Sequence, residues 1–482
     1  MLLNKIPNIL IVITDQQRFD TLSCYGNQWI HTPNLNRLAE ESFVFKNAYV
    51  TQPVCTPSRS SILTGLYPHT NGLVRNGISL NKETKTIAEL VSSEYSRIYH
   101  GKWHLGNDSK PQHGFEKWVT THYPELREKE SSDYHKWVSS MGVEFPNYDV
   151  RPGGDGSASQ YAVFQANLPE QFSQASYIGD VTASALLDLG NDDSFLMVAN
   201  FFEPHPPYSG PLNGLYNPKT IPVGPGFLNR PKNVSEFHIS RSDYYLKGNH
   251  RSDSVAACDG YDLSKESGWR ELRSNYMANV TLVDKNIGRI LDALSRSGKA
   301  EDTIVVFTSD HGDMLGDHGM LEKRSFYEES AKVPLLIKIP WLSQTQKIIS
   351  GNISQIDILP TLLDLIGGTI PSYLEGYSRV NVLMGEQNLE ENDVFIQWNG
   401  VGDRDLGNDT INRMNSIARI CLVTGDRWKL SLGKGDNTEL FDLNSDQYEI
   451  INRATDKNCS KRIELMEQKI YNWKIKTNCL IE

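Results

Sequence analysis

The sequence predicts an α/β protein in which a large, mostly parallel sheet is sandwiched by helices and followed by a smaller α+β domain that carries an antiparallel sheet. Three observations lead to this fold class. Continuous apolar runs typical of doubly buried strands recur along the first part of the chain, long helical patterns lie between them, and after residue 368 the pattern changes to short strands separated by Gly and Asp turns. A chain of 482 residues is long enough for both parts.

The first apolar run, residues 8–14, has the composition of a central parallel strand that is covered on both faces. Three later runs of the same kind are Phe195–Asn200, Thr303–Thr308 and Pro334–Ile339. Between them, Glu271–Ser297 carries apolar residues at steps of three and four, which predicts an amphipathic helix. The polar, Gly-rich stretch at residues 125–174 predicts an insertion at the rim of an active site.

The end of the chain predicts a separate antiparallel sheet. Its expected strands are Phe395–Trp398, Ser416–Val423, Trp428–Leu432 and Glu439–Leu443, followed by a helix at Lys461–Trp473. We therefore expect a catalytic domain at residues 1–384 and a C-terminal antiparallel-sheet subdomain at residues 385–482.

Charge and cysteine content limit the possible partners and the compartment. The net charge of −11 argues against broad binding of nucleic acid, so an anionic ligand needs a local cluster of cations. No segment reaches the length of a membrane span, and the apolar start is broken by Pro7, which predicts a first strand and a cytoplasmic location. The alternative is a periplasmic or secreted protein whose export signal has been removed. Six cysteines form no Cys-x-x-Cys pair, and a disulfide between Cys459 and Cys479 stays open.

Two predicted strand ends carry potential metal ligands. The first strand runs into Asp15-Gln16, and the strand at 303–309 runs into Asp310-His311. Ligands of open α/β sheets bind beyond the carboxyl ends of the strands, so these two ends are expected to converge on one divalent cation. Oxygen ligands favour calcium, with magnesium or manganese as alternatives. One such pair alone is more often a solvated turn.

The segment Cys55-Thr56-Pro57-Ser58-Arg59, followed by Leu63-Thr64-Gly65, carries the most specific signal. Thr-Pro is a good helix start, which places Cys55 at a helix N-terminus, where an anion is stabilised. A buried cysteine that only packs in the core does not explain the polar residues that follow it. A thiolate nucleophile would need a base, for which His104 and His205 are candidates.

The third interpretation is a resemblance. Cys-x-Pro-Ser-Arg with Leu-Thr-Gly resembles the signature of the formylglycine-dependent sulfatases, a family within the alkaline phosphatase superfamily. Four further blocks resemble the family in its order along the chain: Asn8–Arg18, His100–Gly106, Glu203–Tyr208 and Ser309–Lys323.

The resemblance implies a reaction and a set of roles. A maturation enzyme would oxidise Cys55 to formylglycine (3-oxoalanine), whose hydrated aldehyde attacks the sulfur of a sulfate ester. The implied metal ligands are Asp15, Gln16, Cys55, Asp310 and His311. Arg59 would steady the formylglycine, Lys102 and Lys323 would hold the sulfate oxygens, His205 would protonate the leaving alcohol, and His104 would accept a proton when sulfate is expelled. The expected substrate is a sulfated oligosaccharide from a polysaccharide.

Two positions depart from the commonest family form. Gln16 stands where many members have Asp or Asn, and His311 stands where many have Asn. This pairing also resembles the phosphonate monoester hydrolase branch, so a formylglycine-dependent phosphonate monoester hydrolase or phosphodiesterase is one alternative. Choline sulfatase is another, and an inactive sulfoglycan-binding relative is the alternative outside the enzymes.

Overall fold

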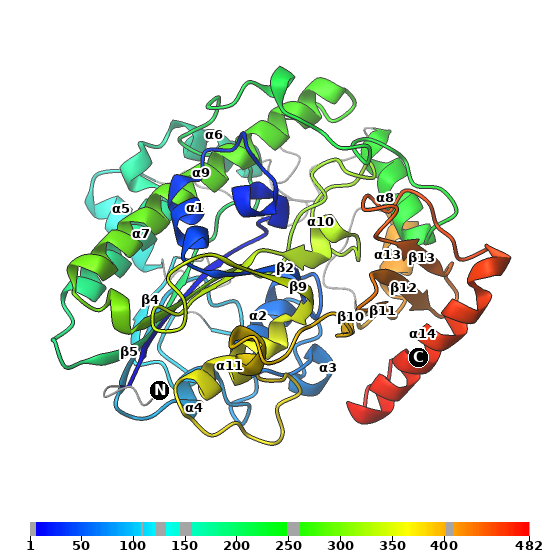
Figure 1. Cartoon of the computed structure of the whole chain (residues 1–482). Helices are drawn as coiled ribbons and strands as arrows, with labels where there is room; N and C mark the ends of the chain where they lie inside the picture. Colours follow the sequence, from blue (N-terminus) through cyan, green and yellow to red (C-terminus); the bar gives the residue numbers. More distant parts are fainter. Residues whose placement is uncertain are drawn as a thin grey trace.

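The computed structural model describes residues 6–107, 109–121, 132–144, 157–247, 261–401 and 408–481, and of residues 157–161 only the backbone. In this part of the chain a nine-stranded sheet forms the centre of the molecule, and a four-stranded sheet lies beside it (Figure 1). None of the helices in these ranges is both long enough and apolar enough to cross a bilayer.

The large sheet has the order β4-β3-β5-β1-β6-β8-β2-β7, with β9 paired to β2. Its strands are β1 Asn8–Thr14, β2 Phe43–Tyr49, β3 Tyr95–Gly101, β4 Lys117–Val119, β5 Ser194–Asn200, β6 Thr303–Ser309, β7 Lys332–Val333, β8 Leu335–Lys338 and β9 Lys347–Ser354. The strands from β4 to β6 are mutually parallel, which confirms the prediction for three of the four apolar runs. The fourth run contains β8, which is antiparallel to β6, because an apolar run reports burial on both faces and not strand direction.

Alternate side chains of β1 belong to two different cores. Ile9, Ile11 and Ile13 pack in a core that includes α2 (Cys55–Thr64) and α11 (Ile358–Leu365). Leu10 and Val12 pack in a second core. That core includes α1 (Pro33–Glu40), α7 (Gln174–Leu187) and α9 (Glu266–Arg296), the long helix predicted from its periodicity. The sheet is therefore sandwiched by helices, as the sequence predicts (Figure 1).

The smaller sheet is antiparallel and has the order β10-β11-β12-β13. Its strands are β10 Val394–Trp398, β11 Arg419–Val423, β12 Trp428–Gly433 and β13 Glu439–Asp442, and α14 (Ser460–Lys476) packs against it through a shared hydrophobic core. The predicted strands and helix are all present, although β11 begins three residues later than expected. The boundary between residues 384 and 385 stays a prediction.

Two sequence expectations concern other regions. Much of the predicted insertion at residues 125–174 lies outside the described residues, and the described part contains α5 (Asp133–Ser140), α6 (Ser157–Asn167) and the start of α7. The disulfide left open between Cys459 and Cys479 is absent, because both are free, buried thiols.

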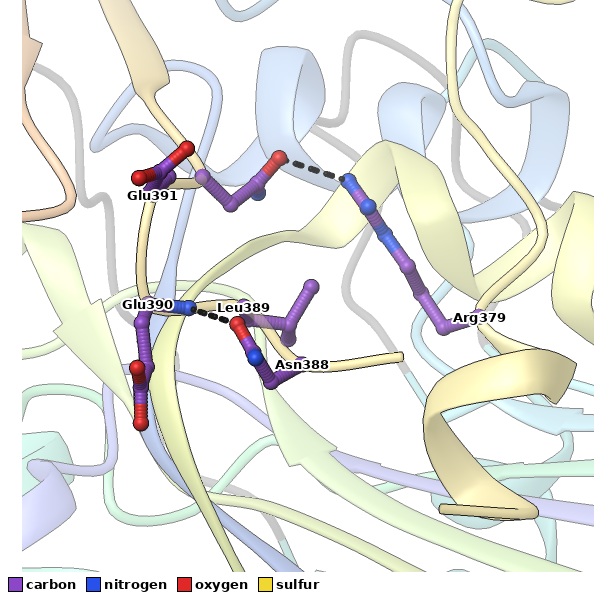
Figure 2. Close-up of a pocket in the computed structure, with 6 residues that line it drawn as sticks. Arg379, Asn388, Leu389, Glu390 and Glu391 are labelled. Atoms are coloured by element: carbon purple, nitrogen blue, oxygen red, sulfur yellow. Dashed lines mark hydrogen bonds between the residues drawn. The ribbon is translucent and has the colours of Figure 1, made fainter. Parts of the chain in front are cut away.

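A surface cavity of about 400 Å³ lies beside the segment that leads to the small sheet (Figure 2). Arg379 and the residues 388–392 line it. The Arg379 guanidinium is already hydrogen-bonded within the protein, since it donates to Asp357 at 2.7 Å and to Asn392 at 3.3 Å. No residue that the sequence predicts for the active site lines this cavity.

Candidate active site

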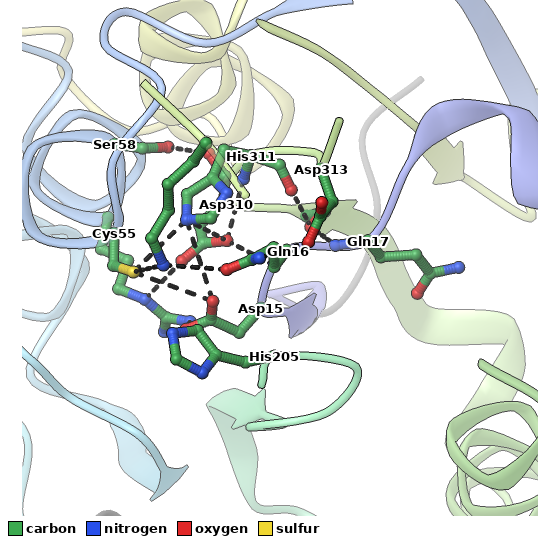
Figure 3. A network of polar contacts seen from close by, with 12 residues as sticks. Asp15, Gln16, Gln17, Cys55, Ser58, His205, Asp310, His311 and Asp313 are labelled. Atoms are coloured by element: carbon green, nitrogen blue, oxygen red, sulfur yellow. Dashed lines mark hydrogen bonds and ion pairs between the residues drawn. The ribbon is translucent and has the colours of Figure 1, made fainter. Parts of the chain in front are cut away.

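The two strand ends meet as the sequence predicts. Strands β1 and β6 are parallel neighbours, and Thr14 is paired with Ser309, so Asp15 and Asp310 follow at matching positions. Asp15 and Asp310 lie close together (Figure 3). Arg59 of α2 bridges the two carboxylates, with its Nη2 2.8 Å from Asp15 and its Nε 2.9 Å from Asp310. Asp15, Asp310 and Arg59 are all buried, so this ion pair network lies at the bottom of the site.

The side chains after each aspartate are held in defined orientations. Gln16 has a left-handed backbone (φ 68°), which is rare for a residue with a side chain, and its N–H donates to Asp310 at 2.9 Å. Its side-chain Nε2 donates to Asp313 and Tyr208, so its Oε1 is directed to the other side, where it accepts from Lys323 at 2.8 Å. His311 donates from Nδ1 to the carbonyl of Gly312 at 2.9 Å, which orients the ring so that Nε2 faces Cys55 and the two aspartates.

Cys55 is the first residue of α2, whose N-cap is Val54 and whose C-cap Gly65 has φ 66°. Its Sγ lies 3.1 Å from Nζ of Lys323 and 3.3 Å from Nε2 of His311. Burial opposes ionisation of the thiol, but Lys102, Lys323 and His311 outweigh burial and hold the pKa of Cys55 well below its ordinary value. The site is therefore built to stabilise negative charge at this position.

The remaining predicted residues surround Cys55. Nζ of Lys102 lies 2.5 Å from Oδ2 of Asp15, and the carbonyl of His104, which is also left-handed (φ 59°), accepts from Thr56 of α2 at 2.7 Å. His205 lies on the loop after β5 (Figure 3). Its Nδ1 donates to the carbonyl of Pro206 at 2.8 Å, so Nε2 is the ring nitrogen that is left to contact a ligand. Burial and the nearby Lys323 lower the pKa of His205 to about 4. The structure thus brings all the predicted site residues together, and their roles stay predictions.

The residues at the strand ends fit a divalent cation. Ligand atoms of Asp15, Cys55, Asp310 and His311 all lie within 4.8 Å of one another. Burial and the neighbouring Asp15 carboxylate raise the pKa of Asp310, as expected where two carboxylates share a site that a cation would neutralise. The oxygens of Asp15, Gln16 and Asp310 suit calcium, while the imidazole of His311 also suits manganese.

Asp313 is a site residue that the sequence does not predict. One of its carboxylate oxygens accepts from Gln16 and Tyr208, and the other accepts from the N–H groups of Leu315 and Glu322, at 2.9 Å and 3.0 Å. It therefore fixes which atom of the Gln16 amide faces the candidate metal ligands. Its only signal in the sequence is its place three residues after Asp310, which does not separate it from an ordinary turn residue.

Replacing Asp313 with asparagine should weaken calcium binding roughly 10- to 100-fold, the usual effect of losing a partner of a metal ligand. The new amide would present N–H groups to Nε2 of Gln16, so the Gln16 amide would turn and direct its own N–H groups at the metal site. Isothermal titration with calcium measures the change. Asp292→Asn on α9 is the control, because its carboxylate is 64% exposed and pairs only with Arg37 among the described contacts. An unchanged calcium affinity would show that Asp313 does not orient Gln16.

Comparison with known proteins decides the family. The family model described as "Sulfatase" matches residues 7–368, and the model described as "N-sulphoglucosamine sulphohydrolase, C-terminal" matches residues 316–476. The chain belongs to the sulfatase family. The first match spans the large sheet and every predicted site residue, and the second includes the small sheet and α14.

Several relatives of this sulfatase-family chain are known. The N-acetylglucosamine-6-O-sulfatase of Bacteroides thetaiotaomicron is 29% identical over 79% of this chain and 72% of that protein. A solved structure in complex with its substrate D-glucosamine-2-N,6-O-disulfate has a TM-score of 0.73 and 24% identity, and covers 98% of both chains. The phosphonate monoester hydrolase of Agrobacterium radiobacter has a TM-score of 0.79 and 23% identity, over 98% of this chain and 96% of that one. Both structures support the alkaline phosphatase-like fold.

Proposed function

We propose that this sulfatase hydrolyses sulfate esters of a sulfated oligosaccharide, using a formylglycine made from Cys55 and a divalent cation, with calcium preferred. The observation that carries the proposal is the position of Cys55 at the N-terminus of α2, in contact with Lys323 and His311 and beside Asp15. A relative that acts on N-acetylglucosamine-6-sulfate and a structural neighbour with a sulfated glucosamine support a sugar as the substrate.

The cation would be held by Asp15, Gln16, Asp310, His311 and the formylglycine, and it would supply positive charge for the attacking hydroxyl and the sulfate oxygens. The chain provides the remaining positive charge. Nζ of Lys102 and Nζ of Lys323 converge on the Cys55 position, where they can hold sulfate oxygens as charge develops on them. Arg59 neutralises Asp15 and Asp310 beneath the nucleophile.

In the first step, one hydroxyl of the hydrated formylglycine would lose its proton to solvent, which the charge of the cation would favour, and its oxygen would bond to sulfur as the bond between sulfur and the sugar oxygen breaks. His205 donates a proton to the departing sugar oxygen. Burial and Lys323 hold the pKa of His205 low, and the added negative charge of a bound sulfate ester beside the ring would raise it and favour the protonated form.

In the second step, the other hydroxyl of the sulfated formylglycine loses its proton to His104. The carbonyl re-forms, the bond between carbon and the sulfate oxygen breaks, and inorganic sulfate leaves. Water then hydrates the aldehyde again. This route needs two hydroxyl groups on one carbon, which explains why an oxidised cysteine is required and a plain alcohol is not enough.

A phosphonate monoester hydrolase or phosphodiesterase is the second candidate. It is favoured by Gln16 and His311, whose pairing resembles that branch, and by the fold likeness to the Agrobacterium radiobacter enzyme. Lys102 and His104 belong to a block that resembles the sulfatases and favour the first candidate.

A substrate panel tests the proposal. The protein, produced together with a formylglycine-generating enzyme and loaded with calcium, is given defined sulfated glucosamine oligosaccharides, choline sulfate, a phosphate diester and a phosphonate monoester. We expect inorganic sulfate release from at least one sulfated sugar at a kcat/KM at least tenfold above that for the phosphorus esters. Faster turnover of a phosphorus ester, with formylglycine verified by mass spectrometry, would favour the second candidate.

A further inference from the structure

Lys323 lies in a backbone segment that is strained on both sides. The residues before and after it, Glu322 (φ 63°) and Arg324 (φ 75°), both have left-handed conformations although neither is glycine. Such conformations cost energy and persist only where surrounding groups impose them. The Lys323 side chain, which contacts Gln16 and Cys55, therefore depends on whatever holds this segment.

Arg241 of α8 (Glu236–Leu246) holds the segment by its carbonyl groups. Its Nη1 donates to the carbonyl of Lys323 at 2.8 Å, and its Nη2 donates to the carbonyl of Leu321 at 2.5 Å. Arg241 is only 3% exposed, and its guanidinium lies 5.2 Å from the ring centre of Phe237. Burying a guanidinium is costly, and here its donors bond to one carbonyl just before the strained turn and to one within it.

The same helix makes a second contact with this segment. Nδ1 of His238 donates to Glu439 of β13 at 2.8 Å, and its Nε2 is hydrogen-bonded to Oγ of Ser325 at 3.1 Å. His238, Ser325 and Glu439 are all buried. Two residues on one face of α8, His238 and Arg241, thus hydrogen-bond to residues 321–325.

The small sheet holds α8 in turn by its N-terminus. Glu439 accepts from the N–H of the N-cap Ser235 at 2.9 Å, and Asp436 accepts from the N–H of Glu236 at 2.8 Å. Carboxylates at a helix N-terminus satisfy unpaired N–H groups and interact favourably with the helix dipole. A continuous set of hydrogen bonds therefore runs from the C-terminal sheet through α8 to Lys323.

We propose that Arg241 is a positioning residue for Lys323, and that α8 fixes the geometry of the active site from the C-terminal sheet. The part that concerns turnover rests on the proposed function, in which Lys323 holds a sulfate oxygen. The part that concerns geometry does not depend on which ester is hydrolysed.

The first test is hydrogen exchange on the calcium-loaded full chain carrying Arg241→Met. The N–H groups of Glu322 and Arg324 are hydrogen-bonded to Asp313 and to the carbonyl of Pro53, so a peptide that contains them reports the segment. We expect at least tenfold faster exchange there and unchanged exchange in β6. The control is Arg230→Met, because Arg230 pairs with Asp243 on the same helix but is 44% exposed. Unchanged exchange at residues 321–325 would overturn the proposal.

The second test is a double-mutant cycle. Arg241→Met should lower kcat/KM roughly 10- to 100-fold, as a displaced catalytic group does. Because Arg241 acts through Lys323, the variant with both Arg241→Met and Lys323→Met should be no slower than Lys323→Met alone. If the double variant lost the product of the two single losses in kcat/KM, the two residues would act independently, and this result would contradict the proposal.

Two further outcomes are separable. If Arg241→Met does not fold, two milder variants replace it in both tests. One is Arg241→Lys, which keeps the charge but loses the forked donor geometry, and the other is Ser325→Ala. Faster exchange at residues 321–325 and no additional loss of kcat/KM with Lys323→Met are again expected, and the opposite results would overturn the proposal. If the wild-type chain releases no sulfate from any ester, the proposed function fails, while hydrogen exchange still decides whether Arg241 holds the segment.

Discussion

The Cys55→Ala variant will fold normally and release no sulfate above background, a loss on the order of 10⁵-fold or more, as for other covalent nucleophiles. Alanine cannot become formylglycine, and it leaves Lys102, Lys323 and His311 without the anion that they surround. Ion chromatography measures the released sulfate, and thermal unfolding checks the fold. The buried substitution should cost about 1 kcal/mol, a typical value for a single mutation.

A Cys55→Ser variant sharpens this prediction. Serine supplies one hydroxyl group, so the first step can occur, but no second hydroxyl is present to expel sulfate. We expect a stable adduct with the mass of one added SO₃ group on the peptide that contains residue 55, formed once per molecule. Sustained turnover by either variant would contradict a formylglycine mechanism and favour direct attack by water.

The His205→Ala variant will distinguish substrates by their leaving groups. With a sugar sulfate, whose alkoxide is a poor leaving group, kcat/KM should fall about 10²- to 10⁴-fold, the usual contribution of a general acid. With an activated aryl sulfate, whose phenolate needs no proton, the loss should be less than about tenfold by the same reasoning. The comparison uses one calcium-loaded preparation and measures sulfate release from both esters.

The control for this prediction is His31→Ala, because the His31 side chain is exposed. It should leave both rates unchanged. Equal losses of His205→Ala on the two substrates would show that His205 binds or orients the sulfate group and does not protonate the leaving oxygen. The general acid would then have to be sought elsewhere, for instance at His104.

The sequence predicts the fold well wherever a buried element has a recognisable pattern of apolar residues. The apolar runs of β1, β5 and β6 are buried on both faces, so their positions follow from composition. Their parallel arrangement is expected because helical segments lie between the strands in the sequence, and the structure has this arrangement. The convergence of Asp15 and Asp310 then follows from the rule that ligands gather at strand ends, and the residues around Cys55 follow from the family resemblance.

Other features depend on contacts between residues far apart in the chain. The reversed direction of β8 is set by its partner β6 and leaves no trace in an apolar run. Asp313 accepts a hydrogen bond from Gln16, and Arg241 donates one to the carbonyl of Lys323. Such contacts between distant residues leave no periodic or compositional signature in the sequence. The spacing of Cys459 and Cys479 is compatible with a disulfide, but the two thiols stay free in a small hydrophobic core.

The depth of Cys55 imposes an order on the biosynthesis of the active protein. Only 1% of this residue is exposed, and it begins a helix whose residues are all buried between the large sheet and α11. A second protein as large as a modifying enzyme has no access to a side chain in that position. Under the proposed function, oxidation of Cys55 must therefore take place on a nascent or unfolded chain. Molecules that fold before they meet the modifying enzyme would stay permanently inactive. Low specific activity of a preparation would then indicate that modification came too late, and not that the folded site is defective.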